Sequence, residues 1–415
     1  MTAGTKTASA KTFEWWMLTM FAMGAAYSAF VSLLIPPFVT DVTGNASSAG
    51  VVMAIIALGA ILGPPLGSFA DKHSAHRLVL VAGVFGMALS FAMYALSAED
   101  AALYALDAIL MGVSIAAVSA AGPVFIVGAN LPQDVEAKQM TTFQLMMPAG
   151  QLAGGLLLAA TASWSFDARF WLGAGFIGLL GIVSLFTTSA PNARLQAAIA
   201  QRRDVVGEVR KTTLKQIFLS TFGLFWLVLV LTSITSNGIN SQIANILPNV
   251  YGIEERTTSA LISVAGLLNI VLFFPAGRWM ARSGPFPVFT AGVVARTVAA
   301  LGMAGVGLAL DNAVILGAAF MQLLYQANPF VRLGQNTNAA RFATFPQGAV
   351  QGWVIASSAV GSFIGAALGG FLADSIGFNS INWMAGIAGG LAVLLIVLWL
   401  GPANKKLEAE SEADS

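Results

Sequence analysis

The chain has 415 residues, of which 57% are apolar and 9% are charged, with a formal net charge of +1 and no cysteine. Soluble domains carry about 25% charged residues, so this composition excludes a soluble protein and indicates a membrane protein. The small net charge gives no reason to expect nucleic acid as a partner, and the lack of cysteine excludes disulfides, thiolate metal sites and cysteine catalysis. We expect membrane lipids as partners.

Twelve apolar stretches follow one another along the chain, each near the ~20 residues that a helix needs to cross the hydrocarbon core. We therefore predict an all-α membrane protein with twelve transmembrane helices. The predicted spans of the first half are 15–39, 49–70, 78–96, 101–127, 140–162 and 170–188. Those of the second half are 217–239, 257–276, 288–310, 313–330, 349–373 and 381–400.

These spans divide the chain into an N-terminal six-helix bundle, 1–190, and a C-terminal six-helix bundle, 217–402. The cytoplasmic linker 191–216 is rich in Arg and Lys. Its apolar residues are spaced so that a helix could lie on the inner leaflet, and a flexible basic tether is the alternative. The tail 403–415 is polar and ends in acidic residues, which predicts disorder. The linker residues with this spacing are Leu195, Ile199, Val206 and Val209.

The Lys and Arg residues lie mostly on one side of the membrane. An even number of spans places both termini on one side. Of the 20 basic residues, all but three fall on that side, and Arg332 is one of those that do. Arg169 and Arg256 fall on the other side, and Arg296 lies inside a span. Because cytoplasmic loops are enriched in Lys and Arg, both termini are predicted to be cytoplasmic, in a multi-pass protein of the cell inner membrane.

The two halves repeat one another. Small and aromatic residues recur at a nearly constant interval of about half the chain, as expected of transporter folds with internal repeats. The recurring pairs are Pro65 with Pro275, Gly67 with Gly277, Gly150 with Gly361, Gly154 with Gly365, Phe166 with Phe378 and Trp171 with Trp383.

The loop after the second span begins at Gly67 and continues through Asp71 and Lys72 to Arg77. It resembles the cytoplasmic G-x-x-x-D-[RK]-x-G signature of the major facilitator superfamily, with Ser74 in place of the last glycine. A degenerate copy begins at Gly277 and includes Arg282, with Ala281 in place of the aspartate. The resemblance covers essentially the whole chain and implies the fold of that superfamily, two pseudo-symmetric six-helix bundles. The duplicated halves make a functional monomer the simplest expectation.

The resemblance implies a gating role for this loop. In the family the loop stabilises the outward-open form, and we carry that role to Gly67, Asp71, Lys72 and Arg77, whose charges can form polar contacts between the halves. In the second copy Gly277 and Arg282 are the corresponding positions, although without the aspartate that copy is expected to be structural. The alternative is that Lys72 and Arg77 only fix the topology.

The export signatures of the family are incomplete in this chain. Proton-coupled exporters often carry an arginine four residues before a glycine in span four, where this chain has Ala108 before Gly112. Of the fifth-span motif G-x-x-x-G-P-x-x-G-G, the chain keeps Gly150, Gly154 and Gly155 but not the proline or the first glycine.

Two charged residues lie inside predicted spans, where charges are costly and usually functional. Asp107 is about two helical turns into span four, and we predict that it is the proton-coupling acid. The alternative is an interfacial carboxylate grouped with Glu99 and Asp100. Arg296 in span nine is a possible charge partner. No cofactor is predicted, and the proton gradient is the hypothesised driving force.

In the family, spans one, four, seven and ten line a central cavity. Polar residues in these spans are therefore candidate substrate ligands, suited to a polar and mostly uncharged solute or to the polar end of an amphipathic one. The alternative is hydrogen bonding between helices. The candidates are Tyr27, Asn237, Asn240, Gln322, Tyr325 and Gln326.

The predicted function is secondary active transport of a small organic solute by alternating access, with proton-coupled export first. Proton-coupled uptake or facilitated diffusion is the alternative. A polytopic membrane enzyme or a transporter-like sensor would be a different class. The enzyme is disfavoured because both histidines, His73 and His76, lie in the gating loop and no metal-ligand or phosphate-loop motif is present.

Overall fold

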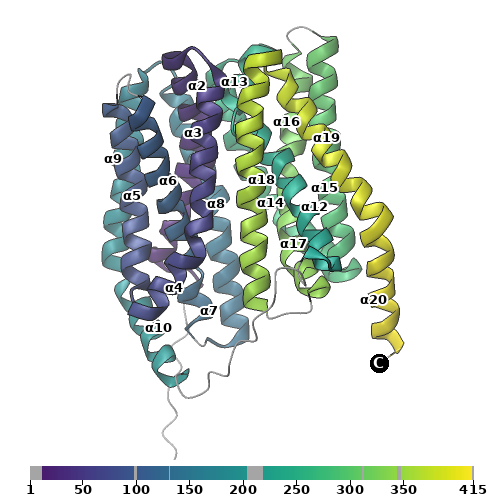
Figure 1. Ribbon diagram of the computed structural model, residues 1–415. Coiled ribbons are helices and arrows are strands. Elements are labelled where there is room, and N and C mark those ends of the chain that lie inside the picture. Colours follow the sequence, from purple (N-terminus) through teal and green to yellow (C-terminus); the bar gives the residue numbers. More distant parts are fainter. Residues whose placement is uncertain are drawn as a thin grey trace, which may run out of the picture.

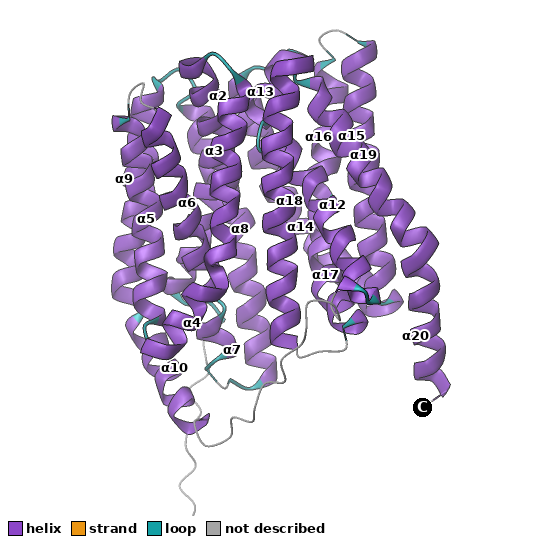
Figure 2. Cartoon of the chain, viewed as in Figure 1, coloured by secondary structure: helices purple, strands orange, loops and turns teal. Residues whose placement is uncertain are grey.

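The computed structural model describes residues 12–97, 101–129, 131–202, 218–310, 313–343 and 347–413. Every regular element within these residues is a helix (Figure 2), and twelve stretches are long and apolar enough to cross a membrane, which confirms the predicted fold class. The spans are Trp15–Thr43, Ala46–His73, His76–Leu96, Leu103–Val127, Lys138–Ala160, Phe166–Thr187, Thr221–Asn240, Glu255–Ser283, Pro285–Ala309, Val314–Phe342, Gly352–Ile376 and Asn379–Leu407.

Several spans in the N-terminal bundle are built from more than one helical segment. Span one runs from a short 3-10 turn through a π-helical segment, and span four ends in a separate short helix. The elements are η1 (Trp15–Met17), α1 (Leu18–Ala25), η2 (Ala26–Val31), α2 (Ser32–Thr43), α3 (Ala46–Leu58), η3 (Gly59–Leu62), α4 (Gly63–His73), α5 (His76–Leu96), α6 (Ala101–Ala121), α7 (Val124–Val127), α8 (Gln133–Ala160) and α9 (Phe166–Thr187).

The C-terminal bundle shows the same kind of segmentation in spans seven, ten and twelve. Helix α10 (Ser189–Arg202) precedes this bundle in the linker. The elements of the bundle are α12 (Thr221–Asn240), α13 (Ile243–Tyr251), α14 (Glu255–Ser283), α15 (Pro285–Ala309), α16 (Val314–Gln326), α17 (Asn328–Phe342), α18 (Gln347–Ile376), α19 (Asn379–Leu395), η4 (Ile396–Leu400) and α20 (Gly401–Ala413).

Glycines allow close helix packing inside each bundle, and they lie at positions that the internal repeat of the sequence relates to one another. A Cβ atom on Gly150 of α8 would lie 2.0 Å from the carbonyl oxygen of Phe21 in α1. A Cβ atom on Gly361 of α18 would lie 2.5 Å from the carbonyl oxygen of Val230 in α12. Span five therefore packs on span one as span eleven packs on span seven, because glycine allows the backbones to approach closely.

The two bundles stand side by side in Figure 1, with α3 and α8 of the first facing α18 and α14 of the second. Here too the backbones are in close contact. A Cβ atom on Gly50 would lie 2.7 Å from Cα of Gly370, and one on Gly266 would lie 2.8 Å from the carbonyl oxygen of Pro148. We call the side of the membrane that holds α4, α10 and α20 the terminal side, and the side that holds α13 the distal side.

The first part of the linker is a helix docked on the N-terminal bundle. Helix α10 buries Leu195, its Arg194 donates to Glu14 at 2.7 Å, and the amide of Gln196 donates to the carbonyl of Ser74 at 3.2 Å. Val206 and Val209 lie outside the described residues.

The tail differs from its prediction. Residues 403–413 were expected to be disordered but continue the last span as α20. Ala, Glu and Lys are strong helix formers, so a segment of this composition extends a helix that the membrane already holds.

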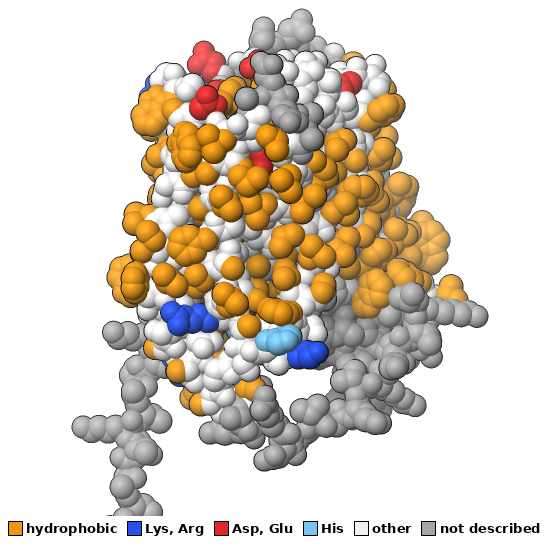
Figure 3. Space-filling model, turned by 60° about the vertical axis from the view of Figure 1, so that its left-hand side comes forward, with side chains coloured by type: hydrophobic (Ala, Val, Ile, Leu, Met, Phe, Trp, Pro, Cys, Tyr) orange, Lys and Arg blue, Asp and Glu red, His pale blue; other side chains and the backbone are white. Residues whose placement is uncertain are grey.

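The outer surface is that of a membrane protein. A belt of hydrophobic side chains covers the middle of the face shown in Figure 3, with acidic residues at the distal end and most of the basic ones in view at the terminal end. The exposed apolar residues include Leu89, Ile182, Leu267 and Leu394. The protein is therefore a multi-pass membrane protein.

Candidate functional site

Three of the spans expected to line the central cavity are spans one, seven and ten. Each departs from regular α-helix next to its candidate polar residues. Tyr27 lies in the π-helical segment η2, and the helix of span seven is interrupted directly after Asn240, at Ser241 and Gln242. In span ten α16 gives way to α17 at Ala327, and Pro329 leaves the carbonyl of Tyr325 without its helical donor. Such interruptions recur at functional sites and at transporter binding sites.

A narrow polar pocket of about 10 Å³, room for about one water molecule, lies where these irregular segments meet. Its polar lining comes from span one (Tyr27 and Ser32) and span seven (Asn237, Asn240 and Ser241). Spans two and eleven close the pocket with Met53, Ala57, Ser362 and Ala366. The structure thus brings the predicted residues Tyr27, Asn237 and Asn240 together between the two bundles.

The three candidates of span ten divide into two groups. The hydroxyl of Tyr325 donates a short hydrogen bond to Oδ1 of Asn240, so Tyr325 extends the polar lining. The amide of Gln322 donates to the backbone carbonyl of Leu261 in α14 at 2.7 Å, and Gln326 donates to Gln322 at 3.1 Å. Gln322 therefore makes the hydrogen bond between helices that was the alternative interpretation, with Gln326 behind it.

Arg332 is a candidate site residue that the sequence prediction misplaced. It was assigned to the terminal-side loop because the apolar run of span ten stops at Phe330, but the helix continues to Phe342. The guanidinium Nη1 of Arg332 lies 3.3 Å from Sδ of Met147 in α8, so the side chain reaches from the C-terminal bundle to the N-terminal one. The side chain is exposed to solvent, and its partner Met147 packs on span one at Gly24, three residues before Tyr27 of the pocket.

Arg296 lies behind this site, buried between α12 and α17. Its Nη2 donates a short hydrogen bond to Oδ1 of Asn328, and its Nη1 lies 3.5 Å from Oγ of Ser236. The nearby charge that acts on it is that of Arg332, which is also positive. Arg296 therefore meets neutral acceptors and another cation rather than an acid.

Asp107 is buried within the N-terminal bundle, apart from the pocket. Its Oδ2 accepts a hydrogen bond of 2.7 Å from Oγ of Ser97, and its backbone carbonyl accepts one of 3.0 Å from Ser90 in α5. The carboxylate is thus held between α5 and α6, and the structure does not bring it together with the other candidate residues. Glu99 and Asp100 lie outside the described residues.

Substitution of Asp107 separates coupling from binding. We expect Asp107→Asn to change the solute dissociation constant by no more than about twofold, because a site without shared partners acts independently of the pocket. Binding and proton release are measured on the same purified sample. A loss of proton release with binding intact would establish Asp107 as the coupling acid, and retention of both would make it a structural carboxylate.

The signature residues make their contacts inside the N-terminal bundle in this conformation. Asp71 pairs with Nε2 of His76 at 2.8 Å, a partner that the sequence prediction missed. Arg77 donates to the carbonyl of Leu185 at 2.8 Å and to Oγ1 of Thr188 at 3.2 Å, both near the end of α9. Lys72 and Arg282 are exposed, and a Cβ atom on Gly67 or Gly277 would meet nothing within 4 Å.

The distal side is closed by polar contacts that join the bundles. The carboxylate of Asp374 in α18 accepts hydrogen bonds from the backbone N–H groups of Ala46 at 2.6 Å and Ser47 at 2.8 Å, at the start of α3. Gln242 donates to the carbonyl of Ala46 at 3.0 Å. Two further pairs lie at this end, Asn245 with Thr40 at 3.0 Å and the ion pair of Arg169 with Glu255. We call this set the distal seal.

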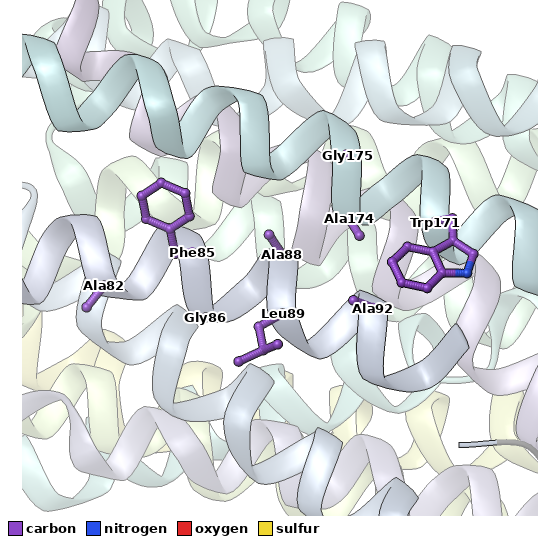
Figure 4. A pocket seen from close by; sticks show the side chains of 9 residues that line it. All are labelled: Ala82, Phe85, Gly86, Ala88, Leu89, Ala92, Trp171, Ala174 and Gly175. Carbon is purple, nitrogen blue, oxygen red and sulfur yellow. The ribbon is translucent and has the colours of Figure 1, made fainter. Parts of the chain in front are cut away.

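An outer groove of about 720 Å³ lies between α5 and α9 (Figure 4). Its lining is made of Ala, Gly and Leu side chains with the rings of Phe85 and Trp171. Leu89 and Trp171 belong to the exposed apolar surface. The groove therefore lies on the belt that faces lipid and offers nothing to hold a polar solute.

Two six-helix bundles with a polar pocket between them, sealed on one side, form the architecture of a membrane transporter. The family model of the Major Facilitator Superfamily matches residues 16–343, and the chain belongs to this superfamily. This confirms the resemblance that the signature loop indicates. No curated protein matches the chain.

Two solved structures show the same fold. A mutant of the nucleoside transporter NupG has a TM-score of 0.72 and 13% sequence identity, with 93% of this chain and 98% of that chain covered. The D-xylose-proton symporter has a TM-score of 0.68 and 14% identity, with 92% and 96% covered.

Proposed function

We propose that the protein is a secondary active transporter that moves a small organic solute across the cell inner membrane by alternating access. The observation that carries the proposal is the asymmetry around the pocket. The distal seal joins the bundles on one side of the pocket, while Arg332 on the other side is exposed to solvent although it touches both bundles. Two conformations with opposite openings would expose this pocket to each side in turn.

The orientation proposed for the protein follows from its basic residues. With both termini in the cytoplasm, the terminal side is the cytoplasmic one, and the conformation described here is inward-facing. In this state the signature loop keeps its contacts within one bundle, which agrees with a loop that acts in the outward-open form. The repeated halves supply both sides of the pocket within one chain, and we propose that a monomer is sufficient.

Two directions of transport follow from different observations. Proton-coupled export is the prediction from the glycines that the chain keeps of the family motif in span five, although the arginine of span four is absent. Proton-coupled uptake is supported by the similarity of fold to the D-xylose-proton symporter, and we favour it. The two are separated by comparing the accumulation of a labelled solute panel in cells with and without the protein, since export lowers accumulation and uptake raises it.

We expect Asn240→Ala to reduce transport about tenfold or more, because the substitution removes a pocket amide and leaves the Tyr325 hydroxyl unpaired. Transport is measured as initial solute flux into proteoliposomes with an imposed pH gradient. Asn249→Ala is the matched control, since Asn249 is exposed on α13 and its one hydrogen bond in the described part of the chain goes to the carbonyl of Asn245 at 2.8 Å. Equal flux in Asn240→Ala and the control would contradict a role of the pocket in transport.

A further inference from the structure

Two guanidinium groups stand next to the pocket with few hydrogen bonds. Arg332 offers five N–H donors, and its one hydrogen bond to a described residue goes to the thioether of Met147, a weak acceptor. Arg296 is 6% exposed and contacts the neutral groups of Asn328 and Ser236. Its Nε is buried without a partner among the residues that the structure describes. Asn328, which Arg296 contacts, lies four residues before Arg332 in α17, so the two arginines lie on the same face of that helix.

No carboxylate in the described part of the chain balances these charges. Within the described ranges, no carboxylate forms an ion pair with Arg332 or Arg296. The acids whose partners are described are Asp107 with Ser97, Glu255 with Arg169, Asp374 with the start of α3, Glu14 with Arg194 and Asp71 with His76. The protein therefore leaves a concentration of positive charge at the meeting point of its bundles.

A charge at membrane depth is rare, and such a charge normally pairs with a partner or faces a water-filled cavity where it serves a function. A bound anion would supply the missing partner. Guanidinium groups bind carboxylates through two parallel hydrogen bonds, which fixes orientation as well as charge. The pocket next to Arg332 adds the hydroxyl of Tyr27 and the amides of Asn237 and Asn240, which suit the neutral part of a solute.

We propose that the transported solute is a small organic carboxylate and that Arg332 is the residue that binds its carboxylate group. This inference rests on the proposed transport function and narrows its substrate class. Arg296 adds positive charge on the side of Arg332 away from the pocket. It also donates a hydrogen bond to Asn328, in the first turn of the helix that carries Arg332. The expectation from sequence, a mostly uncharged solute, is replaced because it did not take Arg332 into account.

The test uses pairs of ligands that differ in charge but hardly in shape. The thermal midpoint of the purified full-length protein is measured with benzoate against benzamide and with succinate against succinamide, and with glycerol 3-phosphate against glycerol. We expect a saturable rise in the midpoint with at least one carboxylate and none with its amide. Equal effects within each pair, no effect of any carboxylate, or a response to glycerol 3-phosphate alone would overturn the proposal.

Variants of Arg332 distinguish a ligand-binding arginine from a structural one. We expect Arg332→Gln to weaken carboxylate binding about tenfold or more, and Arg332→Lys to keep part of the affinity. Without ligand, the midpoint of Arg332→Gln should equal or exceed that of the wild type, because an unbalanced charge is removed. Arg278→Gln, an exposed arginine of α14, is the control for charge. A lower midpoint or a misfolded Arg332→Gln would show a structural role and overturn the assignment.

The same ligands separate this inference from the transport function. A carboxylate that binds through Arg332 but shows no flux in proteoliposomes would refute transport and keep the binding site. Flux of an uncharged solute that Arg332→Gln leaves unchanged would refute the carboxylate and keep transport.

Discussion

Asp374→Ala is expected to shift the protein toward a conformation that is open on the distal side. The carboxylate of Asp374 accepts two backbone N–H groups at the start of α3, across the boundary between the bundles. Hydrogen bonds to a charged group are among the strong ones, and a carboxylate at a helix N-terminus also interacts favourably with the helix dipole. Loss of these contacts affects only the conformation with the distal side closed, so the ratio of the two states should change about tenfold.

The shift is measured by electron paramagnetic resonance distances between spin labels. The chain contains no cysteine, so labels can be attached to introduced cysteines without removing others. A distal pair at Val42 and Leu310 should move apart in Asp374→Ala, and a terminal pair at Phe69 and Trp279 should approach. All four side chains are exposed.

Asp41→Ala is the matched control for this experiment. Asp41 is an exposed carboxylate at the distal end of α2, and no hydrogen bond or ion pair is found for it within the described residues. The control should keep the wild-type distances. Unchanged distances in Asp374→Ala as well would mean that the Asp374 contact does not hold the distal side closed.

Gly150→Val is expected to prevent folding. A Cβ atom at this position would lie 2.0 Å from the carbonyl oxygen of Phe21 and 2.8 Å from the backbone nitrogen of Ala25. Both atoms belong to the backbone of span one, which cannot move aside as a side chain would. Overpacking of this kind destabilises by about 3 kcal/mol or more, a large part of the stability of an ordinary domain.

The measurement is the yield of monodisperse protein after solubilisation and size-exclusion chromatography. Gly175→Val is the control, because Gly175 lies within span six and a Cβ atom there would meet nothing within 4 Å. The control should be recovered at the wild-type level while Gly150→Val is lost or aggregated. Similar recovery of both variants would show that α1 and α8 can separate without loss of the fold.

Hydropathy predicted the number and order of the spans because lipid demands long apolar helices, whatever their tertiary contacts. Hydropathy misplaced the ends of spans that line the interior of the protein. Span ten was ended at Phe330, yet Arg332 and the polar residues after it continue the same helix to Phe342. Backbone hydrogen bonding continues through polar residues where protein or water surrounds them, and an average over apolar residues cannot detect this.

The site was predicted in part. Tyr27, Asn237 and Asn240 were found because polar residues on central spans of a known fold are few. The pairs that close the distal side join segments far apart in the chain, 328 residues in the case of Asp374 and Ala46, and no local pattern links them. Asp107 was chosen by its depth along a helix, but depth does not show which neighbour a side chain faces.

The distal seal also affects how tightly the solute binds from each side. Opening the distal side requires the seal to break, so without solute the distal-open state is the minor one. A ligand that can reach only a minor state binds with an apparent affinity reduced by the population of that state. The same solute should therefore have a higher half-saturating concentration on the distal side of a vesicle than on the terminal side, even though it occupies one pocket.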